Sequence, residues 1–386
     1  MKWWPLVMVM TFLGGCSNGT PTHLSAEEKR VDQAYQALPA LADRLRDPVE
    51  AFGVKLFSSS DSYALGDMVE QHGNTLWQAA VKDAAERADY DDRALYWTRL
   101  QMTRLLRSSS IYKLLPGQDQ QQLLWWLELA SRGNADIRFA DDADVKILLT
   151  GFDPFFLDRN IAQSNPSGVA ALLLDGAVFD LDGRKVQIES YILPVRFGDF
   201  DQGMVEAVMA PLLEKQGVDM IVTVSMGREE FDLERFPGLR RSAEAPDNLN
   251  VYTGATKAEP QVPLLKGEPL SGPEFVEFSL PVDAMLAQRG TFPVNDNHHV
   301  TTLSGEHIPQ TLAGLEGETS VSGSGGGYLS NEVSYRSIRL RNLHQPELPV
   351  GHIHTPRITE HDPLVLKSIV DQVRELVLAA ATTITD

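Results

Sequence analysis

The chain has little cysteine, a deficit of positive charge and no long apolar run after its first residues. Cys16 is the single cysteine among 386 residues, so neither an internal disulfide nor a multi-cysteine metal cluster can form. The 34 basic side chains are outnumbered by 53 acidic ones, giving a formal charge of −19. This balance argues against nucleic-acid binding, because phosphate backbones need clustered Lys and Arg. The remaining composition, 43% hydrophobic and 23% charged, is typical of a folded globular protein.

The first residues resemble a targeting signal. Lys2 precedes an apolar run of about ten residues, Trp3 to Phe12, which is too short to span a bilayer as a helix. The run ends in Leu13-Gly14-Gly15-Cys16, which resembles the lipobox of bacterial lipoproteins. We therefore expect a signal peptide over residues 1–15, a lipid on Cys16 and a tether over residues 16–23. The chain would then be lipid-anchored on the extracytoplasmic side of a bacterial cell envelope. The alternative is a plain secretory signal that ends near a cysteine.

Residues 24–140 show the apolar spacing of helices. Helices are predicted over residues 24–46, 74–87, 91–107 and 118–131, separated by serine-rich or Pro-Gly segments. Trp125 and Trp126, in the last of these, are expected to be core residues. The region carries no motif with recognisable chemistry, which leaves open that it acts as a docking module.

Strands alternate with helices from residue 144 onward. Short apolar strands are predicted over residues 145–150, 186–193, 220–224 and 350–354. Helices are predicted over residues 168–174, 203–216, 280–288 and 363–382. This alternation predicts an α/β fold, a three-layer α/β/α sandwich with a mostly parallel sheet over residues 144–386. Functional groups in such sheets tend to lie in loops at the carboxyl ends of the strands.

Four short blocks in this second part form a recognisable set. The blocks are, in chain order, Gly151-Phe152-Asp153-Pro154-Phe155 with Asn165-Pro166-Ser167; Arg228 with Glu234-Arg235 and Pro246-Asp247-Asn248; Gly326-Gly327-Tyr328-Leu329-Ser330-Asn331; and Gly351-His352-Ile353-His354-Thr355-Pro356. In order and spacing, from residue 145 to about residue 382, they resemble one family, pyroglutamyl peptidase I, also called pyrrolidone-carboxylate peptidase.

The resemblance implies a hydrolase that removes an N-terminal pyroglutamyl, or similar acyl, residue from peptides without a cofactor. It implies a catalytic triad in which Glu234 is the acid, His354 the base and Ser330 the nucleophile. It also implies that Phe152 and Phe155 grip the pyroglutamate ring, with Asn165 in the same substrate site. The expected partner is a peptide with a blocked N-terminus, and an oligomer is possible.

The family nucleophile is a cysteine, and here the position holds Ser330. A hydroxyl is far less ionised than a thiol near neutral pH, so a serine depends more strongly on its base. His354 can serve as that base if Glu234 fixes its tautomer and stabilises the imidazolium. A helix is expected over residues 331–340, whose N-terminal amides would favour a developing oxyanion.

Several positions depart from the family pattern. Val224 stands where the family has Gln, Met226 where it has Gly, and Glu244 where it has Arg. Arg240 or Arg241 could compensate for Glu244. The segment from Gln288 to Thr319 is longer than its family equivalent by roughly twenty residues, and long insertions often form lids or binding loops.

These departures keep a second hypothesis open, an inactive lipoprotein that binds a peptide or a partner on the same scaffold. Ser330 would then be an ordinary helix-capping serine. A zinc site at His352 and His354, or at His298 and His299, is disfavoured because no acidic or cysteine partner has ligand spacing, so no metal is expected. The glycines near Ser324 lack the Gly-Lys-Ser/Thr of a phosphate loop.

Overall fold

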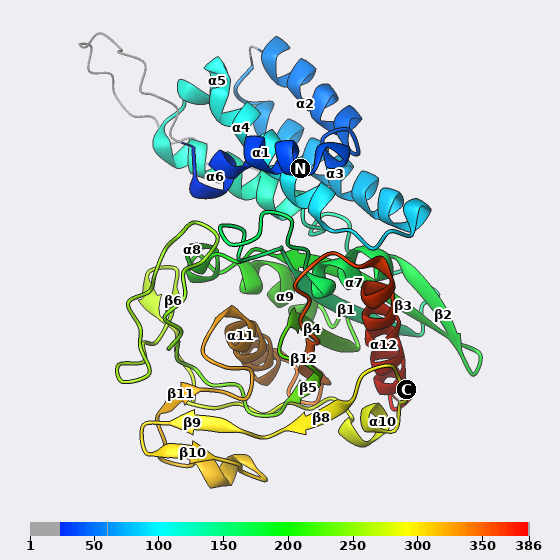
Figure 1. Cartoon of the computed structure of the whole chain (residues 1–386), viewed down its shortest axis with the longest axis vertical. Coiled ribbons are helices and arrows are strands. Elements are labelled where there is room, and N and C mark those ends of the chain that lie inside the picture. Colours follow the sequence, from blue (N-terminus) through cyan, green and yellow to red (C-terminus); the bar gives the residue numbers. More distant parts are fainter. Residues whose placement is uncertain (1–23, 60, 385–386) are drawn as a thin grey trace.

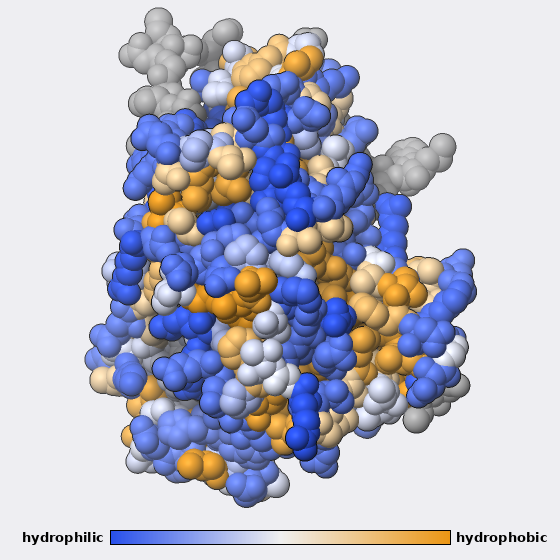
Figure 2. All heavy atoms as spheres, turned by 45° about the vertical axis from the view of Figure 1, so that its right-hand side comes forward, coloured by the Kyte–Doolittle hydropathy of each residue, from blue (hydrophilic) through white to orange (hydrophobic). Residues whose placement is uncertain are grey.

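The computed structural model describes residues 24–59 and 61–384, which form a helical region packed on an α/β region (Figure 1). The predicted signal peptide, Cys16 and the tether lie outside these residues. Within the described ranges, no helix combines the length and apolar character needed to cross a bilayer. Figure 2 shows one face that is mostly hydrophilic with separate hydrophobic groups.

The helical region contains six α-helices among the described residues: α1 (Ala26–Ala37), α2 (Arg46–Ser58), α3 (Leu65–Arg87), α4 (Arg93–Ser108), α5 (Ser110–Lys113) and α6 (Gly117–Ala130). The single helix predicted over residues 24–46 is wrong, because Pro39 cannot donate to the helix ladder and a 3₁₀ turn (Pro39–Leu41) follows α1. Helix α2 was not predicted, although Val49, Phe52 and Leu56 bury one of its faces. Trp125 and Trp126 are half-buried and pack against the cores.

The α/β fold class is confirmed. Seven strands form one sheet in the order β2-β3-β1-β4-β12-β5-β8, with bounds β1 (Val145–Phe152), β2 (Ala177–Leu181), β3 (Arg184–Leu193), β4 (Met220–Met226), β5 (Phe231–Glu234), β8 (Val294–Asn297) and β12 (Val350–Thr355). The central strands β3, β1, β4 and β12 are parallel, while β2 and β5 run antiparallel to their neighbours β3 and β12. The inner strands are buried along nearly their whole length because helices cover both faces.

Helices form a layer on each face of this sheet. On one face, α7 (Pro166–Leu174) and α12 (Pro363–Ala381) bury Val145, Val222 and Ile353. On the other, α9 (Met204–Glu214) and α11 (Leu329–His344) bury Leu148, Ile221 and Val350. Two shorter helices, α8 (Phe197–Asp201) and α10 (Val282–Leu286), complete these layers.

The segment expected to form a lid or binding loop, Gln288 to Thr319, contains three short strands and a 3₁₀ helix (Leu312–Leu315). Its strand β8 extends the main sheet beside β5, and β9 (Val300–Thr302) with β10 (Gly305–His307) joins β11 (Ser320–Ser322) in a small second sheet. A two-stranded ribbon of β6 (Leu264–Leu265) and β7 (Glu268–Pro269) lies elsewhere on the surface. In Figure 1 the small sheet lies at the end of the molecule opposite the helical region.

Candidate active site

The structure brings Glu234 and His354 into direct contact at the ends of neighbouring strands. Glu234 is the last residue of β5, and His354 is the penultimate residue of β12, which pairs with β5. The Nδ1 atom of His354 lies 2.5 Å from Oε1 of Glu234, and Glu234 is 0% exposed. A carboxylate on Nδ1 holds the imidazole with Nε2 directed away from the acid, as a general base requires.

The second oxygen of Glu234 is also held. The Nδ2 group of Asn297, at the end of β8, donates to Oε2 of Glu234 at 2.8 Å and to the carbonyl oxygen of Ser324 at 3.1 Å. The guanidinium of Arg228 lies 4.0 Å from Oε1 of the same carboxylate. These partners satisfy a charge that would otherwise be costly to bury.

Ser330 lies in the first turn of α11. The helix begins at Leu329 with Tyr328 as its N-cap, so Ser330 is the second helical residue and does not cap the helix. The first intrahelical hydrogen bond runs from Glu332 N to Tyr328 O, which leaves the preceding amides at the helix start available to an anion. The Ser330 hydroxyl donates to the carbonyl oxygen of Gly325 at 3.2 Å.

The glycine-rich loop before α11 brings this helix start close to His354. Gly326 has φ of +91°, a conformation that favours glycine. A Cβ on Gly327 would lie 2.0 Å from Oγ of Ser242, whereas a Cβ on Gly325 would lie 3.6 Å from Cε1 of His354. The hydroxyl of Ser330 therefore bonds to a residue that borders the imidazole ring.

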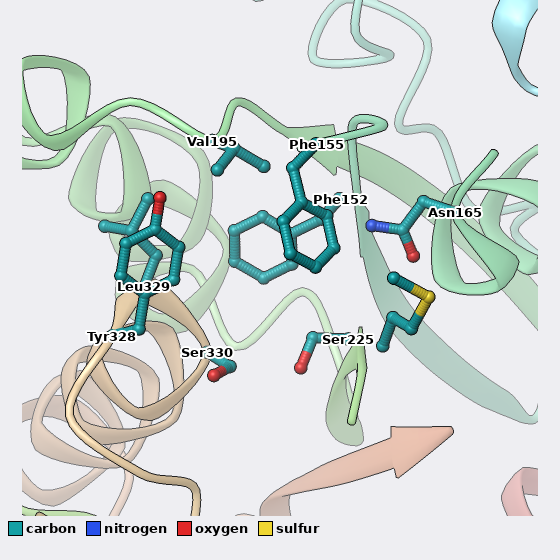
Figure 3. Close-up of a pocket in the computed structure, with 9 residues that line it drawn as sticks. Phe152, Phe155, Asn165, Val195, Ser225, Tyr328, Leu329 and Ser330 are labelled. Atoms are coloured by element: carbon teal, nitrogen blue, oxygen red, sulfur yellow. The ribbon is translucent and has the colours of Figure 1, made fainter. Parts of the chain in front are cut away.

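A small cavity of about 40 Å³ lies beside Ser330. Its lining combines six apolar or aromatic residues with two hydroxyls and one amide: Phe152, Phe155, Val195, Met226, Tyr328, Leu329, Ser225, Ser330 and Asn165. Figure 3 shows the two phenylalanine rings between Tyr328 and Asn165, with the Ser225 and Ser330 hydroxyls drawn below them. The cavity thus brings together four of the six residues that the sequence predicts for catalysis or substrate binding.

The family departures fall in different places. Met226 lines the cavity, and both Met226 and Val224 belong to the core that α7 and α12 cover. Glu244 is exposed. Arg240 pairs with Glu274 and Arg241 pairs with Glu332, so both arginines that could compensate for Glu244 are held by other carboxylates. The Arg241–Glu332 pair instead fixes the first turn of α11.

The helical region holds the cavity loops in three places. Arg99 of α4 and Arg132 contact the buried carboxylate of Asp153 at 2.6 and 2.8 Å. The carboxylate of Asp92 accepts hydrogen bonds from the Ser164 hydroxyl at 2.6 Å and from the backbone N–H of Asn165 at 3.0 Å. Burial raises the pKa of Asp92 to about 7. The region expected to carry no chemistry is therefore in direct contact with the segments that carry Phe152 and Asn165.

A third contact links α1 to the Pro-Asp-Asn block. Arg30 donates to the carbonyl oxygen of Asn248 at 2.6 Å. The amide of Asn248 in turn donates to the carbonyl oxygen of Pro154 at 2.9 Å. Sequence reasoning did not find Arg30, Asp92 or Arg99, because their only local signal is a charged residue within an amphipathic pattern.

Comparison with known proteins matches both regions to one family. The profile of the C-terminal domain of PA0049 matches residues 146–277 and 290–359, and that of the PA0049 N-terminal domain matches residues 11–128. The uncharacterized protein PA0049 of Pseudomonas aeruginosa is 31% identical over 82% of this chain and 73% of its own length. The chain belongs to the PA0049 family. The helical region corresponds to the N-terminal domain of this family, and the α/β region corresponds to its C-terminal domain.

Similarity to peptidases is more distant. A pyrrolidone-carboxylate peptidase of Alkaliphilus oremlandii is 23% identical over 56% of this chain and 80% of its own length. The solved structure of pyroglutamyl peptidase I from Bacillus amyloliquefaciens is 23% identical, covers 63% of this chain and 100% of its own, and has a TM-score of 0.43. A likeness of that size carries no information on activity.

Proposed function

We propose that this protein is a hydrolase that removes an N-terminal pyroglutamyl, or similar small acyl, residue from peptides. The observation that carries the proposal is the buried 2.5 Å contact between Glu234 and His354, next to a cavity that Ser330 lines. The distant sequence similarity to pyrrolidone-carboxylate peptidases supports the same reaction class.

The proposed reaction is acyl transfer in two steps. The Ser330 Oγ attacks the acyl carbonyl while Nε2 of His354 takes the hydroxyl proton, and Glu234 stabilises the imidazolium. The amides at the start of α11 stabilise the oxyanion. The proton then passes to the leaving amine as the amide bond breaks, and water hydrolyses the acyl–serine ester by the same proton path. Rotation of the Ser330 side chain away from Gly325 precedes the attack.

The test is release of a fluorescent amine from a pyroglutamyl amide. Wild-type protein is expected to turn the amide over, and Ser330→Ala to lose at least about a thousandfold in kcat. Ser334→Ala is the control on the same helix, because Ser334 lies one turn further along α11, is fully buried and is not among the cavity residues. Equal activity of wild type and Ser330→Ala would exclude Ser330 as the nucleophile.

The second candidate is a binding protein without turnover. The hydrogen bond from Ser330 to Gly325, directed to a carbonyl oxygen, is the observation that favours it. Saturable binding of pyroglutamyl peptides by wild type and Ser330→Ala alike, with no released amine over days, would support this candidate over the hydrolase.

We also propose that Cys16 carries a lipid that anchors the chain to the outside of a bacterial membrane. The lipobox-like segment Leu13 to Cys16 is the support for this. Labelled palmitate is expected to enter the wild-type chain and not Cys16→Ala, and label in both would contradict it.

A further inference from the structure

A chain of hydrogen bonds runs beneath the cavity, beside the Glu234–His354 pair. Thr223 of β4 and His352 of β12 are partners in register, and Oγ1 of Thr223 lies 2.8 Å from Nδ1 of His352. The other ring nitrogen, Nε2, lies 2.8 Å from Oγ of Ser225. Ser225 lines the cavity, so this chain ends at the cavity surface.

The hydrogen bonds of Thr223 determine which group donates in each bond of this series. Thr223 Oγ1 also contacts the carbonyl oxygen of Gly351 at 3.2 Å, and a carbonyl oxygen can only accept. The single hydroxyl proton of Thr223 is therefore used on Gly351, and Thr223 accepts from Nδ1 of His352. Burial and the nearby His354 ring hold the pKa of His352 well below its usual range. A neutral ring that donates through Nδ1 must accept at Nε2.

Ser225 consequently donates its own proton to His352. Toward the cavity, the Oγ atom of Ser225 can therefore only accept a hydrogen bond, through its lone pairs. Asn165 provides the opposite polarity, since its Oδ1 accepts from the amide and hydroxyl of Ser167 while one Nδ2 proton goes to the carbonyl oxygen of Asp153. The second Nδ2 proton is what Asn165 can offer to a ligand.

We propose that Ser225, oriented by His352 and Thr223, is a specificity-determining hydrogen-bond acceptor that selects acyl groups carrying an N–H donor. Asn165 donates to a carbonyl oxygen of the same acyl group, and the aromatic side chains that line the cavity pack against a flat ring. A lactam has this combination of adjacent N–H and C=O groups. The proposal rests on the proposed function and names the feature of the acyl group that the site recognises.

The decisive comparison is between a lactam and its lactone counterpart, which replaces the ring N–H by an oxygen. The lactone places an acceptor against the Ser225 acceptor, leaving both unsatisfied. With the full chain, kcat/KM for the pyroglutamyl coumarin amide is expected to exceed that for the 5-oxotetrahydrofuran-2-carbonyl coumarin amide by roughly 10- to 100-fold beyond their intrinsic reactivity ratio.

Variants then identify the residue that discriminates. Ser225→Ala is expected to lower the lactam/lactone ratio by roughly tenfold or more, mainly by losing rate on the lactam. Thr223→Val is expected to lower the ratio too, because it removes the acceptor that fixes the His352 tautomer. Thr150→Val is the matched control: Thr150 pairs with Thr223 in register on the neighbouring strand, and its buried hydroxyl has no partner among the described residues. An unchanged ratio in Ser225→Ala overturns the proposal.

A separate measurement does not depend on turnover. Nuclear magnetic resonance of protein labelled with ¹⁵N-histidine reports the tautomer of His352, expected as Nδ1–H. Detection of Nε2–H would reverse the chain and overturn the proposal. If wild type hydrolyses neither amide, the proposed function fails, and titration with the free lactam and lactone acids then decides the inference: binding of the lactam acid at least tenfold tighter supports it, and equal or absent binding overturns it.

Discussion

Asn297 is the side chain that links Glu234, the proposed catalytic acid, to the loop before Ser330, the proposed nucleophile. It donates to Glu234 and to the carbonyl oxygen of Ser324. Hydrogen bonds to buried charged groups contribute about 1.5–3 kcal/mol, and their loss leaves the carboxylate underpaired. Asn297 is therefore expected to act on the reaction through Glu234, without touching the substrate.

Replacing Asn297 by Ala is expected to lower kcat by about 10- to 100-fold with little change in KM. Steady-state kinetics on the pyroglutamyl amide measures this split. Asn295→Ala is the control on the same strand, because Asn295 contacts Glu230 and Asp232 instead. Combined with Glu234→Gln, the Asn297 change should add almost nothing, and full additivity of the two losses would show that Asn297 acts elsewhere.

The strands and helices around the site depend on close backbone packing. The loop of residues 323–327 reaches α11 only because its glycines allow near contact with Ser242 and Asn331. Gly327→Ala would place a Cβ 2.0 Å from Oγ of Ser242, so we expect it to displace the start of α11 and reduce activity by at least about tenfold.

Two comparisons make that prediction specific. Gly325→Ala is expected to be tolerated, since its nearest neighbours would lie at 3.4–3.6 Å. Ser242→Gly combined with Gly327→Ala should restore part of the activity by removing the obstructing hydroxymethyl group. Activity assays and a melting curve for each variant check this; a Gly327→Ala protein with full activity would contradict the packing argument.

The sequence predicts helices and strands that have a local pattern better than it predicts contacts between residues far apart in the chain. The strands predicted over residues 145–150 and 350–354 are present. Glu234 contacts His354, and Ser330 bonds to Gly325, which borders the His354 ring. Helix α2 was missed because Pro48 and Gly53 interrupt its pattern, although proline is tolerated in a first helical turn. Asn297 could not be found because its role depends on β8 pairing with β5.

The molecule as a whole is joined by buried charges between its two regions. Arg99 is 0% exposed and pairs with Asp153, which is 2% exposed. Removing one partner of a buried pair leaves an uncompensated charge and costs about 3–5 kcal/mol. Arg99→Met is therefore expected to lower the free energy of unfolding by that amount in urea titrations followed by circular dichroism.

Arg104→Met provides the comparison on the same helix. Arg104 pairs with Asp32, which is 72% exposed, so its loss is expected to cost at most about 1 kcal/mol. If both variants lose a similar free energy of unfolding, the buried Arg99–Asp153 pair stabilises the junction no more than the exposed pair does.

The junction also predicts how stability depends on pH. Burial raises the pKa of Asp92 from 3.8 to about 7, so the folded chain holds this proton more tightly than the unfolded chain. The resulting stabilisation is fully present below about pH 4 and is lost as the pH rises through 7, by about 4 kcal/mol in total. Asp175 and Glu189, with pKa values raised to about 6 and about 7 by burial, act in the same sense.

Asp92→Asn should remove this part of the pH dependence, because an amide does not titrate. The free energy of unfolding of the variant, relative to wild type, is expected to rise between pH 5 and pH 8 in urea titrations. Asp141→Asn, at an exposed position, should leave the wild-type dependence unchanged. Parallel curves for wild type and Asp92→Asn would contradict the buried titration.

The wide separation of contacting residues along the chain determines when the site can first exist during synthesis. Arg30 meets Asn248 across 218 positions, and Glu234 meets His354 across 120. Strand β12 lies between β4 and β5, so the sheet stays open until that late strand emerges. A nascent chain therefore cannot form the Glu234–His354 pair until strand β12 has been synthesised. Assembly from such distant partners is also expected to be slow compared with helix formation.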